Sequence, residues 1–215
     1  MSLTESLAQT AGASGISAGD ATVHNLARAL SAGALTAAEL TDFYLARIER
    51  LNPALRAVIA VSPEATGEAL ASDARRAAGT ARGTLDGIPV LIKDNVSALG
   101  LPATAGSPAL LQAEGSDAFL VGRLRAAGAV ILGKSNLSEW ANFRSRPSSS
   151  GLSTLGGQTV NPHGAGRSPS GSSSGSAVAV GRALHRSRSA RRPTDRSCLP
   201  PGCAVSSASS RRSDW

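Results

Sequence analysis

Apolar residues recur at helical spacing in the first quarter of the chain. A short helix is predicted to begin after Thr22, which can cap it, and to end at Gly33. Thr36 followed by Glu39 is a capping-box pattern that opens a second helix, which we expect to stop before Pro53. The apolar face of this second helix is made of Leu40, Phe43, Tyr44, Ile48 and Leu51. Both helices therefore have one face to bury.

Short apolar runs alternate with further helical segments along the next hundred residues. Strands are predicted at 55–61, 88–93 and 129–132, the last closed by Gly133-Lys134. Helices are predicted at 63–78 and after Asp117 as far as Gly128, with a helical turn at 138–143 and a helix start at 177–180. Helices that alternate with buried strands favour a layered α/β fold.

The net charge of +7 over 215 residues raises nucleic acid or an anionic membrane as a partner. Residues 182–215, however, hold eight Arg and two Asp, whereas residues 1–181 hold 14 basic and 13 acidic side chains. The charge therefore belongs to a basic tail with little periodicity, which is typical of a disordered or non-native segment. We expect a flexible arm at 1–20, a nearly neutral domain at 21–181, and this tail at 182–215.

Several classes of protein are not indicated. No apolar run approaches the length of a membrane-spanning helix, and no secretory signal is visible, so the expected location is the cytoplasm. The histidines, His24, His163 and His185, lack the spacing of metal ligands, and Cys198 and Cys203 have no partner pair. We therefore expect no metal and no cofactor.

Lys93 ends the predicted buried strand in Gly87-Ile-Pro-Val-Leu-Ile-Lys-Asp-Asn95. Desolvation lowers the pKa of a lysine, and such a lysine can act as a general base near neutral pH. The alternative is a strand-end lysine that reaches water or pairs with Asp94. The strand pattern leaves both interpretations open.

Two polar segments are candidates beside Lys93. The Gly/Ser loop 170–176 runs directly into an apolar helix start, where hydroxyls and backbone N–H groups suit an anion or oxyanion; the alternative is a flexible linker. Segment 135–143 is interpreted as a packed turn with a structural Trp140. Gly133-Lys134-Ser135 lacks the earlier glycine of a phosphate-binding loop, so that interpretation is dropped.

Four motifs in order and spacing resemble the amidase signature family. They are Gly-Ile-Pro-Val-Leu-Ile-Lys-Asp-Asn at 87–95, Ala-Thr-Ala-Gly-Ser at 103–107, Gly-Lys-Ser-Asn-Leu-Ser-Glu-Trp at 133–140 and Gly-Ser-Ser-Ser-Gly at 171–175. The stretches 138–143 and 156–159 look most like bacterial peptide amidases. The resemblance covers about residues 22–181. It implies a layered fold with a mixed central sheet covered by helices, incomplete in this chain.

The resemblance also implies a Ser–cis-Ser–Lys triad. Lys93 matches the family's catalytic lysine, and Ser172 matches the bridging serine, which in the family follows a cis peptide bond. Neutral Lys93 would take a proton from Ser172, and Ser172 would take one from a nucleophilic serine that forms an acyl-enzyme with a carboxamide or peptide amide.

The family's nucleophile lies in a Thr-Asp-Gly-Ser-Ile type of segment, and this pattern fails here. The corresponding residues are Thr194-Asp-Arg-Ser-Cys198, in which Arg196 takes the counted position and Ser197 has no preceding glycine. Codons for residues 192–197 read two bases further on can encode Thr-Asp-Gly-Ser-Ile. We therefore expect a frameshift between about Gly181 and Leu184, and a chain that is inactive and poorly folded as written.

Two rival functions remain at this point. A pseudo-amidase scaffold would keep the fold without the reaction. A binding protein would use the basic tail to bind nucleic acid or an anionic surface. The tail, however, has no interleaved aromatic residues and no recognisable nucleic-acid-binding motif. The expected partner is therefore a small-molecule or peptide amide, with neither nucleic acid nor a membrane, and the oligomeric state stays open.

Overall fold

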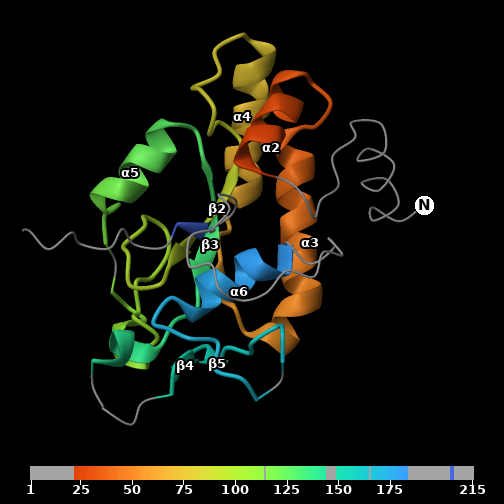
Figure 1. Cartoon of the computed structure of the whole chain (residues 1–215). Helices are drawn as coiled ribbons and strands as arrows, with labels where there is room; N and C mark the ends of the chain where they lie inside the picture. Colours follow the sequence, from red (N-terminus) through yellow and green to blue (C-terminus); the bar gives the residue numbers. More distant parts are fainter. Residues whose placement is uncertain (1–21, 114, 144–148, 165, 184–203, 206–215) are drawn as a thin grey trace, which may run out of the picture.

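A mixed β-sheet lies between helices on its two faces. The structure is a computed structural model that describes residues 22–113, 115–143, 149–164, 166–183 and 204–205. The strand order is β1-β3-β2-β6, with β1 (Val58–Val61) antiparallel to β3 (Val130–Ser135) and with β2 (Pro89–Lys93) parallel to β3. The two-residue β6 (Ala204–Val205) pairs parallel with β2. Helices α2, α3 and α4 lie on one side of the sheet and α5 on the other (Figure 1).

The first two helices begin where their capping residues predict. Helix α2 spans Val23–Ser31, and the Thr22 hydroxyl accepts a hydrogen bond from the Asn25 N–H. Helix α3 spans Ala37–Leu55 and has the complete capping box between Thr36 and Glu39. The N–H groups of Ala37 and Ala38, which the helix itself leaves unpaired, also donate to Asp73 of α4. The side chain of Asp73 thereby ties the start of α3 to α4.

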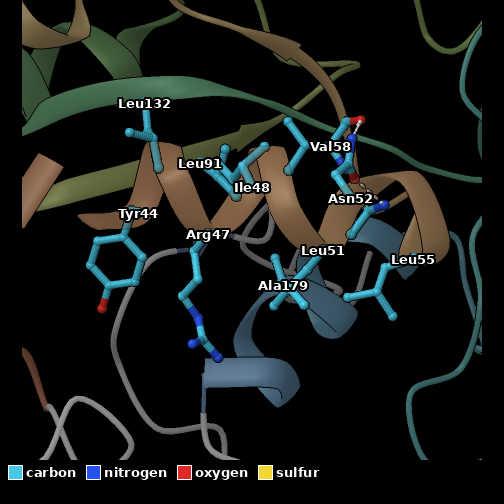
Figure 2. A pocket seen from close by; sticks show the side chains of 11 residues that line it. Tyr44, Arg47, Ile48, Leu51, Asn52, Leu55, Val58, Leu91, Leu132 and Ala179 are labelled. Atoms are coloured by element: carbon cyan, nitrogen blue, oxygen red, sulfur yellow. Dashed lines mark hydrogen bonds between the residues drawn. The ribbon is translucent and has the colours of Figure 1, made fainter. Parts of the chain in front are cut away.

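The expected end of α3 before Pro53 is wrong, because the helix continues through the proline to Leu55. Proline removes one N–H donor, a small loss in the last turn of a helix. The Asn52 side chain then bonds to the residues beyond the helix: it accepts from the N–H groups of Ala57 and Val58 and donates to the Val58 carbonyl at 2.9 Å (Figure 2). Asn52 thus fixes the turn between α3 and β1. Strand β1 is shorter than the strand predicted at 55–61, because the helix occupies residues up to Leu55.

Each face of the sheet has its own apolar core. On one face Leu91, Val130 and Leu132 pack with residues of α2, α3 and α4 (Ala65–Ala77). On the other face Val90, Ile92 and Ile131 pack with α5 (Phe119–Ala126) and with Ala98 and Leu101 of the loop after β2. Strands β2 and β3 are buried along their whole length, as expected of apolar runs without alternation, whereas the edge strand β1 is partly exposed.

Strand β3 contains a bulge that changes which face its later side chains occupy. Val90 pairs with Ile131, but Leu91 pairs with Gly133, so Leu132 is an extra residue. One extra residue exchanges the two faces for every residue that follows. Strand β3 also continues to Ser135, three residues past the predicted end, and carries Lys134 into the sheet.

A buried carboxylate joins α4 to the segment before β2. Asp86 is fully buried and accepts two hydrogen bonds from Arg75 and one from the Arg82 N–H. Burial alone would raise its pKa, but the hydrogen bonds from Arg75 and Arg82 outweigh burial and lower the pKa to about 2. This ion pair fixes the approach to the strand that ends in Lys93.

The remaining elements lie near the ends of β2 and β3. They are η1 (Pro108–Leu110), η2 (Glu139–Asn142), the hairpin β4 (Leu152–Ser153) with β5 (Gly157–Gln158), and α6 (Ser174–Ala183). The expected arm at 1–20 lies outside the described residues, as does the tail apart from 182–183 and β6. Within the part of the chain that the structure describes, no helix is long and apolar enough to cross a membrane.

Candidate functional site

Lys93 and Ser172 meet although 79 residues separate them in sequence. The Lys93 Nζ lies 2.8 Å from the Ser172 Oγ. Lys93 is 3% exposed, and burial lowers the pKa of its ammonium. Pairing with Asp94, one of the alternatives for Lys93, is not what the structure shows, because the carboxylate of Asp94 is paired with Lys134.

The Gly/Ser loop is an ordered part of this site. The peptide bond between Gly171 and Ser172 is cis, and Ser172 is half-buried. Helix α6 begins at Ser174, earlier than predicted, and the Ser174 hydroxyl bonds to the Ser170 carbonyl. A Cβ on Gly175 would lie only 2.3 Å from the Ala57 carbonyl oxygen, so only glycine fits there. These contacts rule out a flexible linker.

The end of β3 faces α6 beside Lys93. Ser135 pairs with Lys93 in the sheet, and its hydroxyl lies 2.6 Å from that of Ser176. The Ser138 N–H donates to the Ser172 carbonyl, and the Ser138 hydroxyl accepts from the Gly151 N–H. The two sequence motifs at 133–140 and 171–175 are therefore one structural unit around the Ser172 backbone.

Asn136 is a hub that sequence reasoning missed as an individual residue. Its fully buried amide donates to the Arg56 carbonyl and to Thr159, and it accepts from the Ser153 hydroxyl. Its backbone carbonyl accepts from the Gly175 N–H. Asn136 thus connects α3, β3, the β4–β5 hairpin and α6. Its position inside the Gly-Lys-Ser-Asn motif was the available signal.

Lys134 is a second buried lysine to which sequence reasoning assigned no role of its own, although it lies in the motif at 133–140. It has no exposed surface, and its Nζ donates to the carbonyls of Val96 at 2.7 Å and Pro102 at 3.1 Å. Asp94 lies 3.7 Å away. Burial lowers the pKa of Lys134, and the charge and hydrogen bonding of Asp94 oppose that shift. Among the described residues, Lys134 therefore has a counterion and Lys93 has none.

The turn at η2 has an unusual backbone. Trp140, Ala141 and Asn142 all have positive φ, between 50° and 66°. The Trp140 N–H donates to the Ala105 carbonyl, and the Glu139 carboxylate accepts from the Thr154 N–H. The Trp140 side chain is half-buried. The expected packed turn is thus held chiefly by backbone and carboxylate contacts.

An apolar pocket lies between α3, the sheet and α6 (Figure 2). Its lining includes Ile48 and Leu51 of α3, Leu91 and Leu132 of the sheet, and Ala179 of α6. Lys93 and Ser172 do not line it. The pocket is therefore part of the packing on this face and carries none of the candidate chemistry.

Two expectations concern ligands and the nucleophile. Among the described residues, no three His, Cys, Asp or Glu side chains are grouped so as to hold a metal ion. Arg196 and Ser197, the residues at and beside the counted nucleophile position, lie outside the described residues.

Comparisons with known proteins agree on one family. The family model described as Amidase matches residues 39–186. A probable amidase of Arabidopsis thaliana is 46% identical over 165 residues, which cover 75% of this chain and 32% of the relative. One subunit of the glutamyl-tRNA(Gln) amidotransferase of Chloroflexus aggregans is 45% identical over 71% of this chain and 30% of its own length.

The same family is found among solved structures. The native peptide amidase of Stenotrophomonas maltophilia aligns with a TM-score of 0.75 and 52% identity, over 77% of this chain and 34% of that one. The chain spans about a third of the length of these relatives. The expected fold, a mixed sheet with covering helices that is incomplete here, is confirmed. The chain belongs to the amidase family, and it corresponds to the N-terminal part of the longer relatives.

Proposed function

We propose that this domain serves the hydrolysis of a carboxamide, with a C-terminal peptide amide as the favoured substrate. The observation that carries the proposal is the 2.8 Å contact between Lys93 Nζ, on a buried side chain, and Ser172 Oγ, on a half-buried one. The 52% identity to a peptide amidase supports this substrate class over other amides. The contact also suggests a role for each of the two side chains.

In the proposed reaction, Lys93 is the base and Ser172 relays the proton. Burial favours the neutral amine of Lys93, which takes the Ser172 proton while Ser172 takes one from a nucleophilic serine. That serine attacks the amide carbonyl, and the C–N bond breaks as the relayed proton passes to the leaving ammonia. Water, activated by the same relay, then hydrolyses the acyl-enzyme ester and releases the carboxylic acid.

The nucleophile is absent from its expected position, so we propose that the chain as written does not complete this reaction. Arg196 has no nucleophilic oxygen, and Ser197 lacks the preceding glycine of the family segment. A shifted reading frame from about Gly181 onward accounts for both this gap and the basic tail. The excess of charge in residues 182–215 then reflects the reading frame and not an acidic partner.

The test begins with the encoding DNA. We expect the frame two bases further on to encode Thr-Asp-Gly-Ser-Ile, and DNA without those codons would reject the frameshift. The protein expressed in that frame should release ammonia from peptide amides, whereas the 215-residue chain should release none. Ammonia release by the 215-residue chain that is lost in Lys93→Ala would show that the nucleophile lies elsewhere.

Two variants of the frame-restored protein test the relay itself. Lys93→Ala and Ser172→Ala should each lower kcat/KM by about 100-fold or more, the usual contribution of a positioned general base. Thr22→Ala, which removes only the cap of α2, is the matched control and should leave kcat/KM unchanged. Wild-type rates in either relay variant would contradict the assigned roles.

A further inference from the structure

The chain contains only two lysines, and both are buried in neighbouring strands. Lys93 ends β2, and Lys134 precedes Ser135, the residue that pairs with Lys93. Because adjacent residues of a strand point to opposite faces, Lys134 and Lys93 leave the sheet on opposite sides. The bulge at Leu132 produces this arrangement, since without the extra residue Lys134 would lie on the face of Lys93.

Lys134 fastens the loop that follows β2. Its two carbonyl acceptors, Val96 and Pro102, lie at two points of that loop, and its ion-pair partner Asp94 directly follows Lys93. The chain from Asp94 to Pro102 is therefore held around one ammonium. Because the Lys134 side chain has no exposed surface, bulk water cannot take the place of these partners if they are lost.

Asp94 extends the same network to the end of the loop. It is 1% exposed, its carboxylate accepts from the Thr104 hydroxyl and from the Gly106 N–H at 3.1 Å, and its own N–H donates to the Ser135 carbonyl. The neighbouring Ala105 then accepts from the Trp140 N–H. Asp94 and Lys134 thus fix both the backbone after Lys93 and the turn next to Ser138.

We propose that Lys134 is a positioning residue for Lys93: by pairing with Asp94 and holding the loop 94–106, it keeps the Lys93 amine on Ser172 and electrically neutralises the carboxylate beside it. This role rests on the proposed function of Lys93 as the base. The described groups that bond to or pair with Lys93 are uncharged: the Ser172 hydroxyl, and Ser135, whose own hydroxyl bonds to that of Ser176. Asp94 is therefore the charge that Lys134 must balance.

Replacing Lys134 gives a signed prediction for Lys93. In Lys134→Met, Asp94 keeps its hydrogen bonds from Thr104 and Gly106 but loses its counterion. An unbalanced carboxylate next to Lys93 stabilises the ammonium, so the pKa of Lys93 should rise by about one unit or more. A merely structural lysine would leave that pKa unchanged.

The experiment is a lysine titration of the 215-residue protein. Protein labelled with 13C-lysine has only two lysine side-chain signals, and Lys134→Met leaves the Lys93 signal alone, so its assignment is direct. The Cε shift is followed from pH 6 to pH 11 in the wild type and in the variant. Circular dichroism at each pH shows that the protein stays folded.

Two further variants keep the proposal open to refutation if Lys134→Met does not fold. Lys134→Met combined with Asp94→Asn removes the buried charge pair as a whole, and should raise the Lys93 pKa less than the single variant does. Thr104→Val removes one hydrogen bond from Asp94 and loosens the loop 94–106. This variant should raise the Lys93 pKa slightly. Phe119→Ala, at a residue that is 87% exposed on α5, is the control and should leave the pKa unchanged.

The outcomes separate this proposal from the proposed function. A wild-type Lys93 that titrates near 10.5 would reject its role as a base, and with it the need for a positioning residue. A lowered wild-type value that does not move in any folded variant of Lys134, Asp94 or Thr104 would reject the role of Lys134 alone. A lowered value that rises most in Lys134→Met supports both.

Discussion

Each face of the sheet holds one buried lysine, and the two lysines differ in the groups that they contact. On the face covered by α6, Lys93 has a serine hydroxyl as its partner and no counterion among the residues that the structure describes. On the other face, Lys134 has a carboxylate and two carbonyl oxygens. Both ammonium groups are buried, so burial alone does not decide which lysine is available to exchange protons. The partners differ, because the charge of Asp94 opposes the effect of burial on the pKa of Lys134, whereas burial acts on the pKa of Lys93 without such an opposing charge among the described residues.

The largest expected difference between the two faces is in stability. Lys134→Met should lower the free energy of unfolding by about 3–5 kcal/mol, because it leaves Asp94 and two carbonyls buried without their partner. Lys93→Met should cost less than about 1 kcal/mol or stabilise the fold, since it removes a buried amine whose described partner is a neutral hydroxyl. Urea unfolding of the two matched variants at pH 7 measures the difference. Equal losses would break the comparison.

Helix α6 gives a test that affects one face only. A methyl group on Gly175 would meet the backbone of Ala57 and Asn136, so Gly175→Ala should displace α6 and destabilise the fold by about 1–3 kcal/mol. The Cε signal of Lys93 should shift, while that of Lys134 should not.

The matched control for Gly175 is Gly122 of α5. A Cβ there meets nothing within 4 Å, so Gly122→Ala should stabilise the fold by about 0.5–1 kcal/mol. If Gly175→Ala also stabilised the fold, or moved the Lys134 signal instead, the assignment of α6 to the Lys93 face would be wrong.

The smallest effect concerns alkaline pH. The folded state lowers the pKa of Lys93 below 10.5, so between those two pKa values the unfolded chain binds the extra proton. The free energy of unfolding contributed by Lys93 therefore rises with pH through this window. Any stability advantage of Lys93→Met over the wild type should shrink from pH 7 to pH 10, as followed by the urea midpoint. An advantage that grows with pH would mean that burial raises the pKa of Lys93.

Local sequence signals predicted the features that depend on neighbouring residues. The caps at Thr22 and Thr36 and the buried strand ending in Lys93 are of this kind. Pro53 misled the prediction because the Asn52 side chain, reaching forward to Val58, holds the helix end beyond it.

The position of Lys134 could not be predicted in the same way. Its face depends on the bulge in β3, and its acceptors are backbone carbonyls more than 30 residues earlier, which carry no sequence signature. Ser172 was found by motif resemblance, because a Gly/Ser run has no apolar pattern that would place it beside a strand end. The register and the long-range backbone contacts were thus the parts that sequence alone did not supply.

The many contacts of Asn136 have a consequence for the order of folding. They join segments that lie 80, 23 and 17 residues away along the chain, and the Lys93–Ser172 contact spans 79. Contacts between distant residues form only after the intervening loops have closed, which is slow compared with helix formation. We therefore expect helices α2 and α3 to form early, and the Lys93–Ser172 pair to assemble among the last contacts of the folding reaction.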